Sequence, residues 1–341
     1  SNSFCTLLAF VSTMTGAEPQ SAVQCCHSIA EIRRWRRECS SAQRRVGCVP
    51  TMGHLHEGHL GLVRAAFAAG CDAVVVTIFV NPTQFGPAED YDAYPRTLAC
   101  DLEKLSGIEH DPRSVLAVFA PPTSEMYPDG VDSAVLAFTV APTPQPPMHI
   151  ESVLRPHLYA GIATIVLRLF NICTPDDALF GRKDAFQCDL IAAMARTLNV
   201  DVRLHMCPTA RETDGLAMSS RNTYIDPAAR AHAVALPRAC SDAIRTFAAL
   251  CSGGDAPPFE APTPLSRVIR RHLVDNFCKT FELAVRHEQC PVSFELQYAD
   301  VSVDGGAGTL GWICCGEWQD HAPDPATEAP NAPRCAPVGR T

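Results

Sequence analysis

From Arg45 onward, the chain alternates short β-branched apolar runs with longer helical patterns, and this alternation restricts its fold more than any other feature. The stretch "RRVGCVPTM" predicts a strand that ends in a glycine turn, and "EGHLGLVRAAFAAG" predicts a helix that ends at Gly70. The stretch "DAVVVTIFV" predicts a buried strand that ends at Asn81 and Pro82. Strands separated by helices in this way are typical of a parallel sheet with crossover helices.

A second unit of the same kind runs from "DDALF" through the turn "GRKD" into the helical pattern "AFQCDLIAAMARTL", and "VDVRLHMCPT" predicts a further strand. In open α/β sheets, ligands bind beyond the carboxyl ends of the strands. Four polar segments follow the predicted strands, namely 50–59, 81–85, 181–187 and 207–221. We therefore expect these segments to meet at one rim of the sheet and to form the binding site there.

Composition excludes several classes of protein. The 341 residues carry a formal net charge of -9, which disfavours nucleic acid as a partner. The 17 cysteines are an odd number, are scattered and form no C-x-x-C pair, so we expect reduced, buried thiols in a cytoplasmic protein rather than zinc ligands. No stretch approaches the ~20 apolar residues of a membrane helix, and the first residues, "SNSFCTLLAFV", lack the basic start of a signal peptide.

Three Pro-rich segments, 141–149, 251–264 and 321–341, interrupt the pattern and are expected to be loops or disordered. The glycines of 306–311 match the dinucleotide fingerprint G-x-G-x-x-G by letters alone. They stand near the end of the sequence with no strand-helix-strand unit around them, so we interpret them as a glycine turn.

The stretch "VPTMGHLHEGHLGLV" places three histidines and three glycines ahead of the first predicted helix. His56 and His59 are three residues apart, whereas the zinc pair of a metalloprotease helix needs a spacing of four. The glycine spacing of a phosphate loop is present, but His59 and Leu60 replace its lysine and hydroxyl. What remains is a helix N-terminus that offers backbone N–H groups and imidazoles to a phosphate, which predicts a nucleotide site. His54 is expected to be an ordinary surface residue.

Three further features are ambiguous when each is taken alone. Lys183 follows a strand and opens a helix, where it could meet phosphate or simply be solvated. Asp184 alone would be a carboxylate at a helix N-terminus. The stretch "MSSRN" at 218–222 suits a triphosphate and equally suits a capped turn.

Taken together in order, five stretches resemble the pantothenate synthetase (pantoate-β-alanine ligase) family of the His-x-Gly-His nucleotidylyltransferase superfamily. They are "VPTMGHLHEGHL", "IFVNPTQFGPAEDYDAYPRT", "EMYPDG", "LFGRKDAFQ" and "PTARETDGLAMSSRN". The resemblance covers roughly residues 25 to 305 and implies two steps. ATP and pantoate would give pantoyl adenylate and pyrophosphate, and β-alanine would then displace AMP to give pantothenate. It also implies a Mg²⁺ ion carried by the triphosphate, with no metal site made by the protein, and a homodimer.

The resemblance implies a role for each residue that matches a family motif. For ATP, the implied contacts come from the first signature, the turn after the second unit, and the "MSSRN" loop: Met52, Gly53, His56, His59, Gly181, Lys183, Asp184, Ser219, Ser220 and Arg221. Of these, the residues expected to act in catalysis are His56, His59, Lys183, Ser219, Ser220 and Arg221. For pantoate, the implied wall consists of Pro50, Thr51, Met52, Asn81, Gln84 and Gln187.

The sequence departs from the family in places. Where relatives read something like "RPGHFRG", this chain has "RPHLYAG" at 155–161, so either Leu158 and Ala160 replace a histidine and an arginine, or His157 takes the role in a shifted register. Arg182 stands where an acidic residue is common, a change we expect to be tolerated. The segment "GWICCGEWQDHAPDP" is unlike the family's ending, which suggests a piece of a longer, fused polypeptide.

We therefore predict an α/β Rossmann-like domain with a smaller α+β C-terminal lid. The expected boundaries are an extension at 1–24, the nucleotide- and pantoate-binding domain at 25–210, the lid at 211–312, with "FELQYADVSV" as its last strand, and a divergent tail at 313–341. Three rivals remain: a related nucleotidylyltransferase with another substrate, a catalytically silent nucleotide-binding or scaffolding homologue, and an aminoacyl-tRNA synthetase. The last is disfavoured by the acidic charge.

Overall fold

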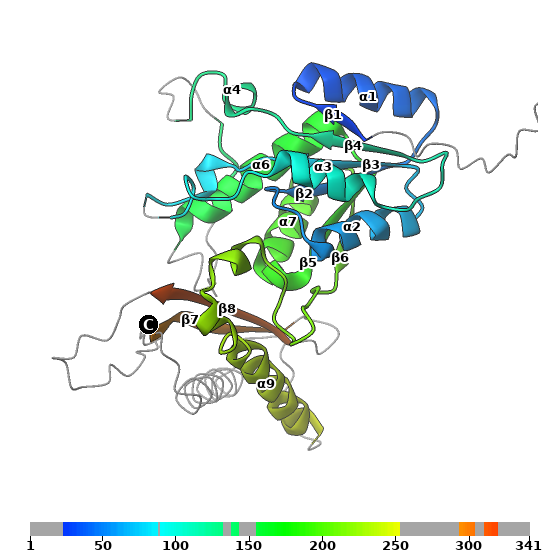
Figure 1. Cartoon of the computed structure of the whole chain (residues 1–341). Helices are drawn as coiled ribbons and strands as arrows, with labels where there is room; N and C mark the ends of the chain where they lie inside the picture. Colours follow the sequence, from blue (N-terminus) through cyan, green and yellow to red (C-terminus); the bar gives the residue numbers. More distant parts are fainter. Residues whose placement is uncertain are drawn as a thin grey trace, which may run out of the picture.

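The computed structural model describes residues 23–87, 89–131, 138–142, 155–252, 293–303 and 310–319. Its centre is a six-stranded parallel sheet with helices on both faces (Figure 1). The strands are β1 (Gln24–Cys26), β2 (Val46–Thr51), β3 (Ala73–Ile78), β4 (Val115–Phe119), β5 (Asp177–Gly181) and β6 (Arg203–Cys207). The helices around them are α1 (Ile29–Ser41), α2 (Glu57–Ala68), α3 (Leu98–Ser106), α4 (Thr123–Met126), α6 (Pro156–Cys173) and α7 (Ala185–Thr197). The α/β class predicted from the sequence is confirmed.

The order of the strands, β1-β4-β3-β2-β5-β6, determines where a ligand can bind. The chain runs outward from β2 through β3 to β4 on one side, and from β5 to β6 on the other. The order therefore reverses between β2 and β5, and in open α/β sheets the ligand site lies at such a switch point, outside the carboxyl ends of the strands. The loop that carries His56 follows β2, and a short 3-10 helix, η2 (Arg182–Asp184), follows β5. Both predicted nucleotide-binding motifs therefore flank the switch point.

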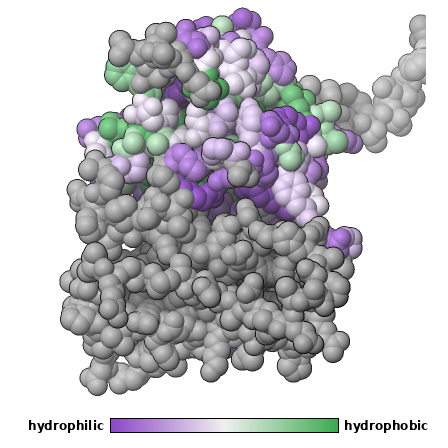
Figure 2. All heavy atoms as spheres, turned by 90° about the vertical axis from the view of Figure 1, so that its left-hand side faces the viewer, coloured by the Kyte–Doolittle hydropathy of each residue, from purple (hydrophilic) through white to green (hydrophobic). Residues whose placement is uncertain are grey.

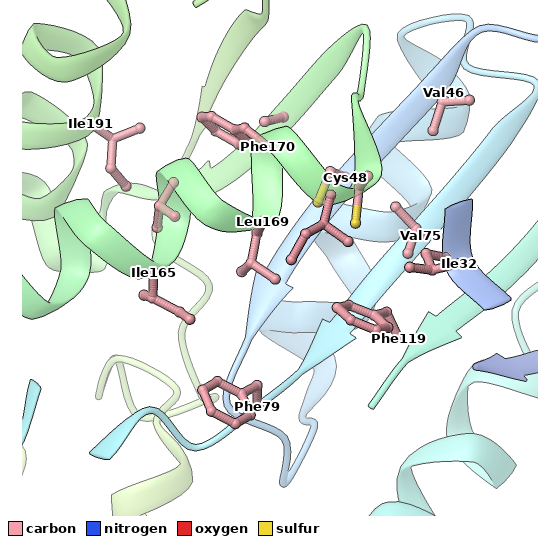
Figure 3. Close-up of a cluster of buried hydrophobic side chains, with 14 of the residues drawn as sticks. Ile32, Val46, Cys48, Val75, Phe79, Phe119, Ile165, Leu169, Phe170 and Ile191 are labelled. Carbon is pink, nitrogen blue, oxygen red and sulfur yellow. The ribbon is translucent and has the colours of Figure 1, made fainter. Parts of the chain in front are cut away.

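The strands are apolar on both faces, because helices cover both sides of the sheet. On one face, Val46, Cys48 and Val75 pack against α1, α6 and α7 in a core that also holds Phe119 and Phe170 (Figure 3). On the other face, the alternate residues of the same strands pack against α2 and α3. The sheet is thus a rigid platform for the loops at its carboxyl edge.

The opposite, amino edge of the sheet is fixed by a buried carboxylate. Asp177, at the start of β5, is fully buried and accepts two hydrogen bonds from Arg45, at 2.5 and 2.6 Å. The ring of His205 lies 2.7 Å from the same carboxylate, and the Cys71 thiol donates to it at 3.7 Å. These contacts tie β2, β5 and β6 together at the edge away from the predicted site.

After β6, the described chain forms η3 (Ser220–Tyr224), α8 (Pro227–Arg230), α9 (Ala235–Ser252) and an antiparallel pair, β7 (Ser293–Val303) with β8 (Leu310–Gln319). The stretch "FELQYADVSV", predicted as the last recognisable strand of the lid, lies in β7, and β8 follows and pairs with it along its length. The expected boundary at 312 falls within β8.

Several expectations lie outside the described residues. These include the extension at 1–22, most of the three Pro-rich segments, and the glycines at 306 and 308, whereas Gly311 lies in β8. Within the described ranges, no helix is long and apolar enough to span a membrane. Cys100 is an exposed free thiol there, whereas six free cysteines are buried: Cys26, Cys39, Cys48, Cys71, Cys173 and Cys188. On the face drawn in Figure 2, green hydrophobic residues occur in small groups among hydrophilic ones.

Candidate active site

The loop between β2 and α2 has an unusual backbone. Gly53 and His54 both have positive φ angles, 87° and 49°, which turn the chain sharply after the strand. A Cβ added to Gly53 would lie 2.9 Å from Cγ2 of Ile78 and 3.3 Å from Oδ2 of Asp101. Only glycine fits this position, because both the backbone angle and the close approach exclude a side chain.

His56 caps the N-terminus of α2, and His59 lies on the first turn of the same helix. Nδ1 of His56 accepts from the Gly58 N–H at 3.2 Å, and Nδ1 of His59 accepts from the His56 N–H at 3.3 Å. The rings are stacked, with centroids 4.0 Å apart. Because each Nδ1 is an acceptor, each neutral ring carries its proton on Nε2. The pair therefore offers two N–H donors at a positive helix end.

Both imidazoles are held in the neutral form. Burial, together with the positive charge of Lys183, lowers the pKa of His56 to about 4. Burial lowers the pKa of His59 to about 3, with added repulsion from His56 and Lys183. The positive charge at this site therefore comes from lysine and the helix dipole, while the histidines act as uncharged donors.

Lys183 belongs to η2, directly after β5, on the other side of the switch point. Its ammonium nitrogen lies 3.4 Å from Oδ2 of Asp184, and the side chains of both residues are partly exposed. Asp184 lies at the N-terminus of α7, as expected of a carboxylate there, in the cap position but without a capping hydrogen bond. Gly181 ends β5, and a Cβ there would meet nothing within 4 Å, which leaves open space beside the turn.

The "MSSRN" segment contacts the first signature directly. The hydroxyl of Ser220 donates to the His54 carbonyl at 3.1 Å, and Ser219 caps η3 by accepting from the Arg221 N–H at 3.3 Å. The guanidinium of Arg221 forms two hydrogen bonds of 2.8 Å with Asp90 and lies over the ring of Tyr94. The hydrogen bonds to Asp90 raise the pKa of Arg221. Arg221 thus joins this segment to the loop after η1 (Pro82–Gln84).

The predicted pantoate residues mostly come together at the ends of β2 and β3. The amide nitrogen of Asn81 donates to Oε1 of Gln84 at 3.2 Å, and the amide of Gln84 contacts the sulfur of Met52 at 3.2 Å. Pro50 and Thr51 form the end of β2 beside them. A cavity of 290 Å³ opens next to this group, with Met52 in its lining. Gln187 lies half-buried on the first turn of α7.

The divergent segment 155–161 begins α6 and faces the loop after η1. Nε2 of His157 lies 3.5 Å from a carboxylate oxygen of Glu89, whereas Leu158 packs partly against the core. Gly161 packs so closely on η1 that a Cβ would lie 2.8 Å from Cα of Gln84. The segment thus places His157 against Glu89 in the loop after η1 and Leu158 toward the interior.

Two residues at the site were missed by the sequence analysis. Asp101 is fully buried, and its carboxylate accepts the N–H groups of His54 and Leu55 at 2.9 and 2.7 Å. Lys104 donates to the Leu55 carbonyl at 2.6 Å, and its charge also lowers the pKa of His56 and His59. One signal was available: Asp101 lies on the apolar side of a helix, between Leu98 and Leu105, where a carboxylate needs partners.

Comparison with known proteins shows the family to which this arrangement belongs. The family profile described as "Pantoate-beta-alanine ligase" matches residues 24–283. The chain belongs to the pantoate-beta-alanine ligase family. Two similar proteins named pantothenate synthetase come from Roseiflexus castenholzii, at 48% identity over 228 residues, and Pelotomaculum thermopropionicum, at 46% over 224 residues. These matches cover 67% and 66% of this chain, and 78% and 75% of the relatives.

Solved structures of the pantoate-beta-alanine ligase family share the fold. The pantothenate synthetase of Thermus thermophilus superposes with a TM-score of 0.63 at 33% identity, covering 86% of this chain and 93% of that structure. A pantoate-beta-alanine ligase from Francisella tularensis, described as complexed with beta-gamma ATP and beta-alanine, gives a TM-score of 0.62 at 25% identity. It covers 86% of this chain and 98% of the other. The family is one of ligases that form a C–N bond.

Proposed function

We propose that this chain joins pantoate to β-alanine in an ATP-dependent reaction that passes through pantoyl adenylate and releases pyrophosphate and AMP. One observation carries the proposal: the neutral imidazoles of His56 and His59 lie at the N-terminus of α2, beside the switch point of the sheet, where the charge of Lys183 lowers their pKa. This constellation suits a polyphosphate, because it combines N–H donors, a helix dipole and a mobile ammonium group. Family membership over 24–283 supports the choice of substrates.

In the first step, a carboxylate oxygen of pantoate attacks the α-phosphorus of ATP, and pyrophosphate leaves. The catalytic need is to hold the two reactants in line and to stabilise negative charge on the phosphate oxygens. We assign this stabilisation to the Nε2–H groups of His56 and His59 and to Lys183. Each lost donor of this kind costs on the order of 3 kcal/mol of transition-state stabilisation.

Pantoate would lie against the group formed by Met52, Asn81 and Gln84, with Gln187 approaching from α7. Neutral amides suit this substrate because they can donate to a carboxylate and both donate to and accept from a hydroxyl. In the ligand-free protein, the amides of Asn81 and Gln84 bond to each other at 3.2 Å. They can exchange this bond for bonds to the substrate without leaving a buried charge unpaired.

In the second step, the neutral amine of β-alanine attacks the acyl carbon of the adenylate. The bond to the AMP oxygen breaks, and the amine releases a proton. The segment with Ser219, Ser220 and Arg221 would close over the nucleotide and keep water from the reactive adenylate. We assign the elements from α8 to β8 to the lid that carries this segment.

Magnesium would arrive on the triphosphate, since it commonly binds through phosphate oxygens and few protein ligands. Among the described residues, no cluster of three or more His, Cys, Asp or Glu side chains could hold a metal ion. The proposal also includes a homodimer in the cytoplasm, as the sequence resemblance implies.

The test measures pyrophosphate and AMP released from Mg-ATP, first with pantoate alone and then with β-alanine added. The proposed reaction gives pyrophosphate with pantoate alone, while AMP and pantothenate form only when β-alanine is present. No pyrophosphate under either condition, from folded protein that binds ATP, would favour a catalytically silent nucleotide-binding protein. Pyrophosphate with another acid, but not with pantoate, would point to a different nucleotidylyltransferase.

A further inference from the structure

The loop that carries the two catalytic histidines is held in a strained conformation from outside. Gly53 and His54 are consecutive residues with φ angles of 87° and 49°. A side-chain-bearing residue in this region costs roughly 1–2 kcal/mol, so His54 would not remain there without support. The residue after His54 is Leu55, which is buried, and the next is His56, the cap of α2. The position of His56 therefore depends on what holds residues 53–55.

The support comes from the carboxylate of Asp101, which lies on α3. Its two oxygens are divided between consecutive N–H groups: Oδ2 accepts from His54 at 2.9 Å, and Oδ1 accepts from Leu55 at 2.7 Å. The hydroxyl of Thr97 also donates to Oδ2, at 3.3 Å. Lys104, one turn further along α3, donates to the Leu55 carbonyl at 2.6 Å. The N–H groups of His54 and Leu55 and the carbonyl of Leu55 are thus bonded to side chains of α3.

The loop packs closely against Asp101 in addition to forming hydrogen bonds with it. A Cβ on Gly53 would approach Oδ2 of Asp101 to 3.3 Å, so the loop lies directly on the carboxylate. Asp101 has no exposed surface, and a buried carboxylate is tolerated only where its oxygens accept hydrogen bonds. The same burial keeps Asp101 from contacting any substrate.

We propose that Asp101 is a positioning residue for adenylation: it fixes the Gly53–His54 turn and thereby directs His56 and His59 toward the α-phosphate. The inference rests on the proposed function for its catalytic consequence, but its structural part concerns the orientation of the two imidazoles alone. A misplacement of about 1 Å in a catalytic group can cost ~100-fold in rate.

Asp101→Asn is the decisive variant because it preserves shape. The amide retains one oxygen acceptor, but its NH₂ group faces a backbone N–H that needs an acceptor. The matched control is Asp177→Asn, which alters an equally buried carboxylate at the opposite edge of the sheet. Both variants are expected to lower the melting temperature, so stability alone does not distinguish them.

Two readouts separate positioning from stability in the full chain. NMR of the imidazole rings, assigned with His56 and His59 single variants, should show shifted ring signals for both histidines in Asp101→Asn and unchanged signals in Asp177→Asn. The kcat for pyrophosphate release should fall about 10- to 100-fold in Asp101→Asn, with the KM for pantoate within twofold of wild type, and kcat should stay within twofold in Asp177→Asn.

Unchanged His56 and His59 signals in Asp101→Asn would overturn the inference, whatever its turnover. Wild-type protein that releases no pyrophosphate would refute the proposed function, while the ring signals would still decide the role of Asp101. If Asp101→Asn does not fold, Thr97→Val removes the hydroxyl that donates to Oδ2 and that also lies 3.3 Å from Nδ1 of His54. It should shift the same ring signals to a smaller extent, and an unshifted spectrum in that folded variant would also overturn the inference.

Discussion

The hydroxyl of Ser220 donates a hydrogen bond to the backbone carbonyl of His54 across 3.1 Å, joining two segments that are 166 residues apart in the sequence. Ser220 is only 7% exposed, so water cannot replace this bond. Ser220→Ala should therefore lower the free energy of unfolding by about 1 kcal/mol and reduce the rate of adenylate formation, because the turn before His56 loses one of its supports. Denaturant unfolding and pyrophosphate release measure the two effects.

Ser241→Ala is the matched control, since the hydroxyl of Ser241 also donates to a backbone carbonyl but lies exposed on α9. It should leave both quantities nearly unchanged. Equal turnover in Ser220→Ala and Ser241→Ala would mean that the contact to His54 has no part in catalysis.

Arg221 should not tolerate lysine, although the charge is retained. A lysine cannot form the two parallel hydrogen bonds that the guanidinium makes with Asp90, nor can it stack as a plane over the ring of Tyr94. We expect Arg221→Lys to lower kcat/KM for ATP about 10-fold or more. Arg45→Lys changes a similar bidentate pair with Asp177 away from the site and should cost stability without a comparable loss of kcat/KM. Similar kinetics in the two variants would contradict a specific role of Arg221.

Sequence reasoning predicted the elements that surround the site, because the relevant segments have strong local signals. The strand, glycine turn and helix from Val46 to Ala68 follow from apolar periodicity, and Gly70, with a φ of 87°, ends the helix as expected. The switch point itself was not predicted, since strand order depends on contacts between distant segments. The short strand β1 also has no local signal, and it forms because it pairs with β4.

The residues of the candidate site also divide into those with a local sequence signal and those whose position depends on distant contacts. His56 and His59 could be assigned from spacing and resemblance, because their function depends on a local helix end. Asp101 could not be placed from spacing, since its partners lie 46 and 47 residues away along the sequence. The hydrogen bonds between Arg221 and Asp90, which are 131 residues apart, likewise cannot be predicted from the sequence.

Gly53→Ala should destabilise the protein more than Gly70→Ala. Both glycines have a φ of 87°, so both variants carry the same backbone strain of roughly 1–2 kcal/mol. A Cβ at Gly70 meets nothing nearer than 3.8 Å, whereas one at Gly53 would lie 2.9 Å from Ile78. The added overpacking should make Gly53→Ala the worse variant by about 1–3 kcal/mol in denaturant unfolding. Equal losses would show that the loop relaxes away from Ile78.

The pH dependence of stability should reflect the two buried imidazoles. In the unfolded chain a histidine has a pKa of ~6.5, whereas burial lowers the pKa values of His56 and His59 in the folded protein to about 4 and about 3. Between about pH 6.5 and 4 the unfolded state therefore binds more protons, and these residues make the folded state lose stability as the pH falls. The melting temperature measured from about pH 7 to about pH 5 should fall less in the His59→Gln variant than in wild type. An equal fall in both would contradict the lowered pKa.

Lys183→Ala provides the most direct test of the phosphate site. Lys183 lies on an exposed turn, and its ammonium group forms an ion pair with the adjacent Asp184. Removing the Lys183 side chain should therefore change the free energy of unfolding by less than about 0.5 kcal/mol. If it pairs with the ATP phosphates, adenylate formation should nevertheless fall by at least about 100-fold, because a charge that stabilises the transition state is lost. The neighbouring Arg182→Ala removes a cation of the same turn and should remain active within a few-fold, since a departure from the family at this position is expected to be tolerated. Single-turnover pyrophosphate release from both variants separates the two residues. Near-normal turnover in Lys183→Ala would remove this lysine from the mechanism, and Lys104, whose charge also acts on the two histidines, would then have to supply the positive charge.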